Sequence, residues 1–401
     1  MRHVFYTECM KRALSTFLLS AFIVSAFPAP AQAADLEVSG WIPYWKVSEG
    51  TKDARKHLDE LTEINPFGYG VKSDGKLNDL AGLSKSAWKK LFKEAREEDV
   101  EIIPTVMWSD TANIYRILSD EKLREKHVKA VADMVKKGKY DGVDIDYEGK
   151  NAATRPYYSL FLKELKSALR GKILACTTEA RTPPESLYRT VPANLEYAND
   201  YKELDRYCDR VRLMTYDQQR ADLKLNDARS GQPYMPIADP DWVKKVIELA
   251  LKSFDKDKIT LGVATYGFEY TLTVSPNWYQ SYVKKWSVTE EYAEDLADDL
   301  RIDPVRNAAG ELSFSYISTT TPSAIPSSIK APRGTLEGNE AAARALAYAN
   351  ATGMTTTVNL LWWSDAEAIE DKVELAKQYG LRGISIFKVD GTEDQDLWDL
   401  F

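Results

Sequence analysis

Three carboxylates stand at alternate positions in the segment Asp141–Glu148, which reads DGVDIDYE. Side chains on a β-strand alternate between two faces, so Asp144, Asp146 and Glu148 would share one face at intervals of about 7 Å. Burial and mutual repulsion raise the pKa of carboxyl groups held this close, and a carboxyl group that keeps its proton can act as a general acid. We therefore predict that Glu148 donates a proton, while Asp146 orients a substrate group or shares a proton with Asp144.

The elements that must position this row alternate along most of the chain between short β-rich runs and amphipathic helical segments. A chain of 401 residues with 44% hydrophobic residues is long enough for a barrel of roughly 250 residues and an insertion. The pattern predicts an α/β fold, a (β/α)8 TIM barrel, with functional residues at the carboxyl ends of its strands. Eight strands are predicted, at Glu37–Pro43, Glu63–Tyr69, Glu101–Met107, Gly142–Tyr147, Ile173–Thr178, Arg210–Thr215, Ile259–Thr265 and Gly383–Phe387.

The regular alternation stops between Tyr266 and about Glu340, where aromatic residues, a helical stretch and a Ser/Thr/Pro-rich run follow one another. This stretch is too long for a loop between a barrel strand and the next helix. We predict a small α+β insertion domain, at about residues 267–340, between strands 7 and 8 of a catalytic barrel that spans residues 34–401. The helix Asn339–Thr352 is then expected to resume the barrel.

The N-terminal segment has the order of a secretory signal. Lys11 and Arg12 precede an apolar run, Ala13–Phe27, which is followed by the small-residue sequence Ala31–Gln32–Ala33. This order predicts a signal peptide at residues 1–33 that is cleaved after Ala33. An uncleaved membrane anchor is the alternative, but the apolar run is short for a membrane span. We therefore expect a secreted, periplasmic or cell-envelope protein with no stable membrane insertion after cleavage.

The composition excludes several classes of function. The formal charge is −8 and no basic run is present, so we expect no nucleic-acid partner. Beyond the predicted signal the only histidines are His57 and His127, which excludes a three-histidine zinc site, and we predict no metal and no cofactor. The P-loop-like segment Gly70–Leu77 lacks the terminal hydroxyl, and an EF-hand reading that starts at Asp144 places Arg155 where a glutamate is required.

Three further residues are expected to have structural roles. Cys176 and Cys208 are the cysteines beyond the predicted signal, and too few for a disulfide framework. We expect them to be buried thiols, with a bridge between them as the alternative. His127 lies in a charged helical stretch and is predicted to be a solvated surface residue. The sequence carries no signal for an oligomeric state.

The carboxylate row resembles the D-G-x-D-x-D-x-E signature of glycoside hydrolase family 18. Other segments are similar to the first, sixth and seventh strands of that family, and the closing part is similar to the branch of bacterial spore-cortex and cell-wall N-acetylglucosaminidases. These segments are Gly40–Trp45, Leu213–Asp217 (LMTYD), Leu261–Gly267, and Leu361–Asp365 through Leu381–Phe387. The resemblance extends over nearly all of the chain beyond the predicted signal.

The resemblance implies a retaining hydrolysis in which the substrate's own 2-acetamido oxygen attacks the anomeric carbon. Glu148 would protonate the glycosidic oxygen, Asp146 would hold the acetamide N–H, and Asp144 would tune Asp146. Tyr216 would hydrogen-bond the acetamide oxygen, with Asp217 beside it contacting the sugar. The implied substrate is a β-1,4-linked polysaccharide that contains N-acetylglucosamine, either peptidoglycan or chitin.

Aromatic residues near the predicted strand ends are candidate surfaces for stacking against sugar rings. They are Tyr44, Trp45, Trp108, Tyr266 and Trp362, together with Phe387, which stands where the family often has a tryptophan. The substitution at Phe387 motivates an alternative function, a non-catalytic sugar-binding barrel protein. A metal-dependent barrel enzyme is a third possibility, because an acidic row can also hold Mg²⁺.

Overall fold

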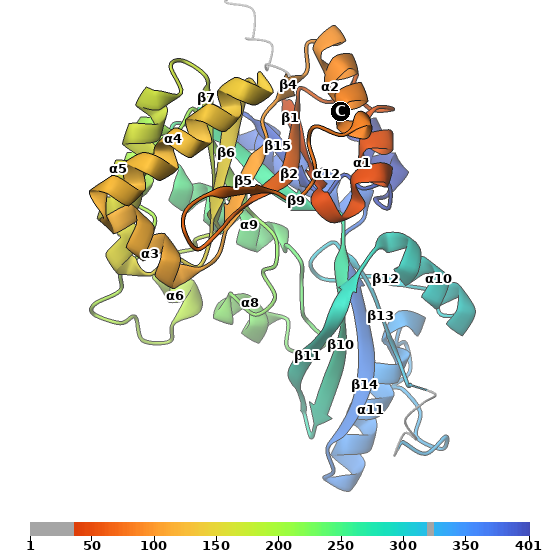
Figure 1. Cartoon of the computed structure of the whole chain (residues 1–401). Coiled ribbons are helices and arrows are strands. Elements are labelled where there is room, and N and C mark those ends of the chain that lie inside the picture. The colour runs from red at the N-terminus through yellow and green to blue at the C-terminus, as the bar shows by residue number, and fades with distance from the viewer. Residues whose placement is uncertain (1–35, 319–324) are drawn as a thin grey trace, which may run out of the picture. The chain divides into compact units, whose positions relative to one another are not determined.

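The computed structural model describes residues 36–318 and 325–401. Eight parallel strands pair side by side, and the pairing of the first strand with both the second and the last closes them into a barrel (Figure 1). The predicted (β/α)8 barrel is therefore confirmed. Its strands in chain order are β1 (Glu37–Pro43), β2 (Glu63–Val71), β5 (Thr105–Trp108), β6 (Gly142–Tyr147), β7 (Ile173–Glu179), β8 (Arg210–Met214), β9 (Ile259–Ala264) and β15 (Gly383–Phe387). The predicted signal peptide lies outside the described residues.

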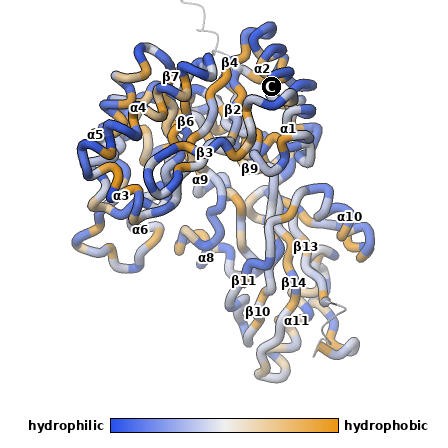
Figure 2. Tube along the Cα trace, viewed as in Figure 1, coloured by the Kyte–Doolittle hydropathy of each residue, from blue (hydrophilic) through white to orange (hydrophobic). Residues whose placement is uncertain are grey.

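Amphipathic helices cover the outside of the barrel. In α9 (Pro240–Ala250), for example, the buried residues recur at helical spacing from Trp242 to Ala250, and the Asp239 side chain caps the first turn. Figure 2 shows this arrangement by hydropathy: the strands inside are largely hydrophobic, and much of the surface of the outer helices is hydrophilic. The other barrel helices are α1 (Val47–Ala54), α2 (Ser86–Glu97), α3 (Thr111–Ser119), α4 (Glu121–Gly138), α5 (Arg155–Ala168), α6 (Pro184–Leu187), α7 (Tyr201–Tyr207), α8 (Leu223–Ala228) and α12 (Ala366–Tyr379). Within the described residues, no helix is both long and apolar enough to cross a membrane.

The interior of the barrel is polar. Glu63 on β2 pairs with Arg210, at 2.7 Å, and with Arg212, and all three side chains are buried. Nearby, the Ser385 hydroxyl lies 2.8 Å from the hydroxyl of Ser39. Charges buried this deeply persist only when they are paired and hydrogen-bonded. The barrel therefore encloses an ion-pair network, into which the carboxylate row of β6 extends.

A second, antiparallel sheet follows β9 and returns to the barrel before β15, as the predicted insertion does. Its strand order is β11-β10-β14-β13-β12, and β10, β11 and β14 lie side by side in Figure 1. Its elements are β10 (Gly267–Ser275), β11 (Trp278–Val288), α10 (Glu290–Leu300), β12 (Val305–Arg306), β13 (Leu312–Tyr316), α11 (Glu340–Thr352) and β14 (Thr356–Trp363). Two small strands, β3 (Leu77–Asp79) and β4 (Glu101–Ile102), pair with β2 at the barrel.

The inserted sheet extends beyond the predicted boundary. Helix α11 was expected to resume the barrel, but it packs against β10, β13 and β14 of the inserted sheet. The sheet therefore ends at Trp363 and not near residue 340. A helix followed by an apolar strand has the same local pattern in a barrel and in an insertion. Only the pairing of β14 with β10, far away in sequence, distinguishes the two.

Cys176 and Cys208 form a disulfide, with Cα atoms 6.0 Å apart. The expectation of free buried thiols is therefore wrong. Cys176 lies on β7, and Cys208 lies just before β8. Next to Cys208, the Asp209 N–H donates to Leu174 O of β7 at 2.8 Å. The pairing of β7 with β8 thus brings two cysteines that are 32 residues apart into bonding range, which their spacing alone does not indicate.

Replacement of both cysteines by alanine is expected to lower the free energy of unfolding by about 2–4 kcal/mol, because the bridge restricts the unfolded chain. Urea unfolding, followed by circular dichroism, measures this difference. The control is the wild-type protein in the presence of a reductant, whose midpoint should fall toward that of the double variant. A wild-type midpoint that the reductant leaves unchanged would show that the bridge contributes nothing.

Candidate active site

Asp144 lies in the middle of β6, is fully buried, and has its partners supplied by four other strands of the barrel, β1, β5, β7 and β8. Its carboxylate accepts hydrogen bonds from Thr105 Oγ1 at 2.8 Å, Thr177 Oγ1 at 2.9 Å and Trp41 Nε1 at 3.2 Å. Arg212 Nη1 lies 3.1 Å from Oδ1. Each of these contacts is a hydrogen-bond donor or a positive charge, so both oxygens of the buried carboxyl group have partners.

Asp146 is the next acid along the same face, and its environment differs. It is 4% exposed, and its Oδ1 has no hydrogen-bond partner among the described residues. Burial raises its pKa well above the ordinary value, and the charges of Glu148 and Asp144 raise it further. Asp146 therefore differs from Asp144 in having a raised pKa and an oxygen without a partner among the described residues.

Glu148 follows the last residue of β6 and is half-buried. Its backbone N–H donates to Trp108 O at 2.8 Å, which continues the strand pairing past Tyr147. Burial raises the pKa of its carboxyl group, the charge of Glu179 raises it further, and the charge of Lys150 opposes the rise. A partly accessible carboxyl group with a raised pKa is suited to general acid catalysis near neutral pH.

Glu179, at the end of β7, is a site residue that was not predicted. The register pairs Asp146 with Thr177, so Glu179 falls beside Glu148 on the inner face. Its Oε1 accepts the Gly149 N–H at 3.1 Å, and its Oε2 accepts Asn199 Nδ2 at 2.9 Å. Strand β7 was predicted to end at Thr178, one residue too early. Glu179 was therefore not recognised as the next inward-facing residue of that strand.

Lys150, two residues after Glu148, was also not predicted. Its Nζ is buried, lies 4.6 Å from the centre of the Tyr158 ring and has no hydrogen-bond partner among the described residues. Burial lowers its pKa, while the charges of Glu179, Asp146 and Glu148 raise it. Lys150 and Glu179 thus act on the acid row with opposite charges, as positioning residues beside it.

Substitution of Glu179 by glutamine should move the alkaline limb of the pH profile to lower pH. A general acid works when protonated, so activity is lost as pH rises through the pKa of Glu148. Removal of the neighbouring negative charge lowers that pKa, because Glu179 no longer opposes ionisation of Glu148. The measurement is kcat/KM against pH, with the exposed Glu185→Gln variant as the matched control. An unmoved alkaline limb would contradict the proposed coupling between Glu179 and Glu148.

Tyr216 and Asp217 follow β8 and face the acid row. The Tyr216 ring stacks on Phe387 with ring centres 5.8 Å apart, and burial and the charge of Asp146 raise its pKa. Tyr266 Oη donates to Asp217 Oδ1 at 2.9 Å. Asp217 has φ 56°, a left-handed conformation that is costly for a residue with a Cβ and is often found at functional sites. The structure therefore brings these four predicted residues together.

Tyr44 and Trp45 follow β1 directly and remain exposed, at 37% and 48%. Their rings meet edge to face at 4.9 Å, and Trp45 also packs on Phe67 at 6.0 Å. Exposed rings held in place by other rings are suitable platforms for sugar stacking. The placement of both residues is compatible with their predicted role.

Trp108 and Trp362 are not sugar-stacking surfaces. Trp108 pairs in register with Tyr147, so it points to the outer face of the barrel, where it is buried against Tyr147 and His127. Trp362 is 1% exposed in the inserted sheet, and its Nε1 donates to Glu311. Each tryptophan was predicted to stack on sugar because it lies near a strand end. Its surroundings depend instead on the face of the strand that it occupies and on the sheet to which the strand belongs.

His127 is likewise buried and not solvated as predicted. It is 1% exposed, and Nδ1 lies 2.6 Å from Gly75 O. Its ring stacks on Phe161, with ring centres 5.5 Å apart, and burial lowers its pKa to about 4. Glu125, Lys126 and Lys129 are exposed on the solvent side of α4, while His127, like Arg124, lies on its buried side.

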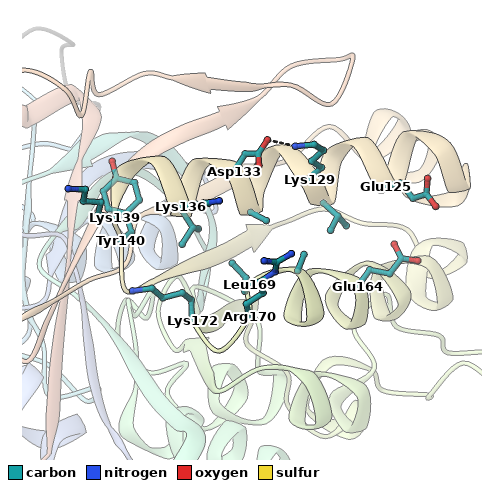
Figure 3. A pocket seen from close by; sticks show the side chains of 14 residues that line it. Glu125, Lys129, Asp133, Lys136, Lys139, Tyr140, Glu164, Leu169, Arg170 and Lys172 are labelled. Carbon is teal, nitrogen blue, oxygen red and sulfur yellow. Dashed lines mark hydrogen bonds and ion pairs between the residues drawn. The ribbon is translucent and has the colours of Figure 1, made fainter.

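A cleft of about 410 Å³ lies beside these residues, and Asp217, Tyr266, Phe387 and Trp45 are among those that line it. A larger hollow of about 910 Å³ lies between α4 and α5 (Figure 3). Its lining mixes charged and apolar residues of the outer helices, including the Lys129–Asp133 ion pair at 2.6 Å, and contains none of the predicted site residues. Within the part of the chain that the structure describes, no group of three or more His, Cys, Asp or Glu residues is arranged to hold a metal. A carboxylate row beside an aromatic-walled cleft, at the carboxyl end of a barrel, is the site of a carbohydrate-cleaving barrel enzyme.

Comparison with known proteins agrees with this class. The family model described as Glycosyl hydrolases family 18 matches residues 38–392, so the chain belongs to that family and is a glycoside hydrolase. It is 25% identical over 368 residues to the Cortical fragment-lytic enzyme of Bacillus subtilis, covering 90% of this chain and 72% of the relative. It is 24% identical over 299 residues to Probable chitinase 2 of Drosophila melanogaster, covering 72% and 54%. The chain thus spans about half to three quarters of the length of these relatives.

The solved structure of the spore cortex-lytic enzyme SleL from Bacillus cereus has a similar fold. Its TM-score is 0.65 at 21% sequence identity, and the alignment covers 91% of this chain and 73% of that one. At this identity the similarity establishes the fold, including the barrel that positions the acid row.

Proposed function

We propose that this protein is an exported enzyme that hydrolyses a β-1,4-linked polysaccharide containing N-acetylglucosamine, peptidoglycan or chitin, with retention of configuration. The observation that carries the proposal is the graded acid row. Asp144 has hydrogen-bond partners for both oxygens, Asp146 has a free oxygen and a raised pKa, and Glu148 is partly accessible with a raised pKa. The names of the relatives, a cortical fragment-lytic enzyme and a chitinase, support the substrate class.

In the first step, Glu148 gives its proton to the glycosidic oxygen as the bond from the anomeric carbon to that oxygen breaks. The oxygen of the substrate's 2-acetamido group forms the new bond to the anomeric carbon, which yields a cyclic oxazolinium ion. Asp146 accepts the acetamide N–H and stabilises the positive charge, and its free Oδ1 is the oxygen that suits this contact. Asp144, held by Arg212, keeps a negative charge beneath Asp146.

In the second step, water attacks the anomeric carbon from the side that the leaving group vacated. Glu148, now a carboxylate, takes the proton from the water, and the acetamide oxygen returns to its carbonyl form. Two inversions at one carbon produce net retention. Tyr216, beside Asp146, would donate a hydrogen bond to the acetamide oxygen in both steps, while Asp217 contacts the sugar and Phe387 and Trp45 stack against it.

Export is part of the same proposal, since a polymer of this kind lies outside the cytoplasm. Its support is the charged, apolar and small-residue order of residues 1–33, with cleavage after Ala33. The protein would therefore act in the cell envelope or outside the cell.

The proposal is tested with chito-oligosaccharides and peptidoglycan fragments as substrates, with products followed by proton NMR and mass spectrometry. The first product should be the β-anomer, and oligosaccharides with the acetyl groups removed around the cleaved bond should resist hydrolysis. An α-anomer as the first product, or equal cleavage of deacetylated substrate, would overturn the substrate-assisted mechanism. Binding of oligosaccharide without hydrolysis would favour the alternative, a sugar-binding barrel.

A further inference from the structure

The cleft beside the acid row is lined by three lysines, although the whole chain is acidic with a formal charge of −8. Lys46 follows β1, Lys284 lies on β11 of the inserted sheet, and Lys388 follows β15. Two acids, Asp217 and Asp390, line the same cleft. Cations from three separate elements therefore line one opening, which also contains the site residue Asp217.

The three lysines differ in how far their charge is already neutralised. Lys388 Nζ makes an ion pair with the buried carboxylate of Asp390 and lies 3.4 Å from Thr392 Oγ1. Lys46 and Lys284 have no carboxylate within 4.0 Å among the described residues. Two cations in the cleft are thus available to a ligand.

Lys284 is the better placed of the two. Its side chain is exposed, and its Nζ lies 4.4 Å from the centre of the Phe268 ring, which also lines the cleft. The next residue, Lys285, points to the opposite face of the strand and pairs with Glu269. A cation held over an aromatic ring keeps its position without losing its charge to a carboxylate.

Asp217 is the remaining acid that faces these lysines. Partial burial raises the pKa of its carboxyl group, while the hydrogen bond from Tyr266 and the charge of Lys284 lower it. The hydrogen bond from Tyr266 directs one oxygen of Asp217 toward the wall of the cleft. Lys46 and Lys284 therefore outnumber the one acid that faces them.

We propose that Lys46 and Lys284 bind a carboxylate carried by the polysaccharide next to the bond that is cut. This inference rests on the proposed function and narrows its substrate class. The substrate is then a glycan whose amino sugars bear a carboxylate-containing ether or peptide substituent, as in peptidoglycan, in preference to the neutral homopolymer. The aromatic wall, including Phe387 and Trp45, supplies stacking for either glycan, and the lysines supply the discrimination between them.

The test compares three soluble oligosaccharides of equal length at low and high salt. One is a neutral chito-oligosaccharide, one a peptidoglycan fragment with its peptides removed but its ether carboxylate intact, and one the same fragment with that carboxylate amidated. A fourth arm retains the peptides, so that the sugar carboxylate and the peptide carboxylate are distinguished. The variants are Lys284→Gln, Lys46→Gln and, as a control for net charge, the exposed Lys252→Gln.

We expect wild-type kcat/KM to be highest for the carboxylate-bearing fragments and to fall with added salt. Each cleft variant should reduce the advantage of the charged over the amidated fragment by roughly tenfold, and its loss should be much larger on the charged fragment than on the neutral substrate. The Lys252 variant should behave like the wild type. Equal cleavage of the charged and amidated fragments by the wild type, or equal losses on neutral and charged substrates in the variants, would overturn the inference.

Binding measurements separate this inference from the proposed function. Titration of the wild-type protein with the same oligosaccharides reports the preference for carboxylate whether or not turnover occurs. A preference for the charged fragment without hydrolysis would contradict the proposed function and support carboxylate binding by Lys46 and Lys284. Hydrolysis without such a preference would support the proposed function and refute carboxylate binding by Lys46 and Lys284.

Discussion

Replacement of Glu148 by glutamine is expected to reduce kcat by roughly 10²–10⁴-fold, the range over which a positioned general acid accelerates proton transfer. Glutamine has nearly the same shape as glutamic acid but has no proton to give. The pKa of Glu148 is raised by burial and by Glu179, so the wild-type side chain holds a proton that the amide lacks. Release of reducing ends from N-acetylated oligosaccharide measures the loss.

A substrate with a better leaving group makes this test specific to proton donation. An aryl glycoside whose phenolate departs without protonation should depend less on the acid, so Glu148→Gln should lose much less activity toward it in the bond-breaking step. The folded state should be almost unaffected, because the amide has nearly the same size and shape as the half-buried carboxyl group that it replaces. An equal loss with both leaving groups would show that Glu148 has a different role.

Replacement of Arg212 by methionine is expected to lower the free energy of unfolding by about 3–5 kcal/mol, the cost of removing one partner from a buried ion pair. Arg212 is 1% exposed in its side chain, and it pairs with Glu63 and with Asp144 inside the barrel. Its guanidinium also lies 5.5 Å from the centre of the Trp41 ring. Without Arg212, the buried carboxylates of Glu63 and Asp144 lose the cation that they share.

Urea unfolding compares this variant with Arg206→Met, in which an exposed pair with Glu203 is lost. The exposed pair should contribute no more than about 0.5 kcal/mol, because water screens it. A second variant that combines Arg212→Met with Glu63→Gln should recover part of the loss, since it removes one of the stranded charges. If Arg212→Met were no more destabilising than Arg206→Met, the interior network would not be a source of stability.

The local pattern of the chain determined the elements and the faces of the strands. Alternation in DGVDIDYE placed Asp144, Asp146 and Glu148 on one side of β6, and the structure has them on the inner face, with Val143, Ile145 and Tyr147 outside. The eight predicted strands correspond to the eight strands of the barrel, because hydrophobic runs bounded by turns are local features of a sequence. The fold class followed from this alternation.

Contacts between distant segments were decided only by the tertiary structure. Strand register placed Glu179 beside Glu148 and turned Trp108 to the outside, and the pairing of β7 with β8 brought Cys176 to Cys208. The partner chosen by β14 assigned Trp362 to the inserted sheet. Each outcome depends on which strands pair and on their relative shift, and a shift of one residue exchanges the two faces of a strand. The acid row is therefore readable from the sequence, whereas the charges that tune it, and the lysines that face its cleft, become visible only when the barrel closes.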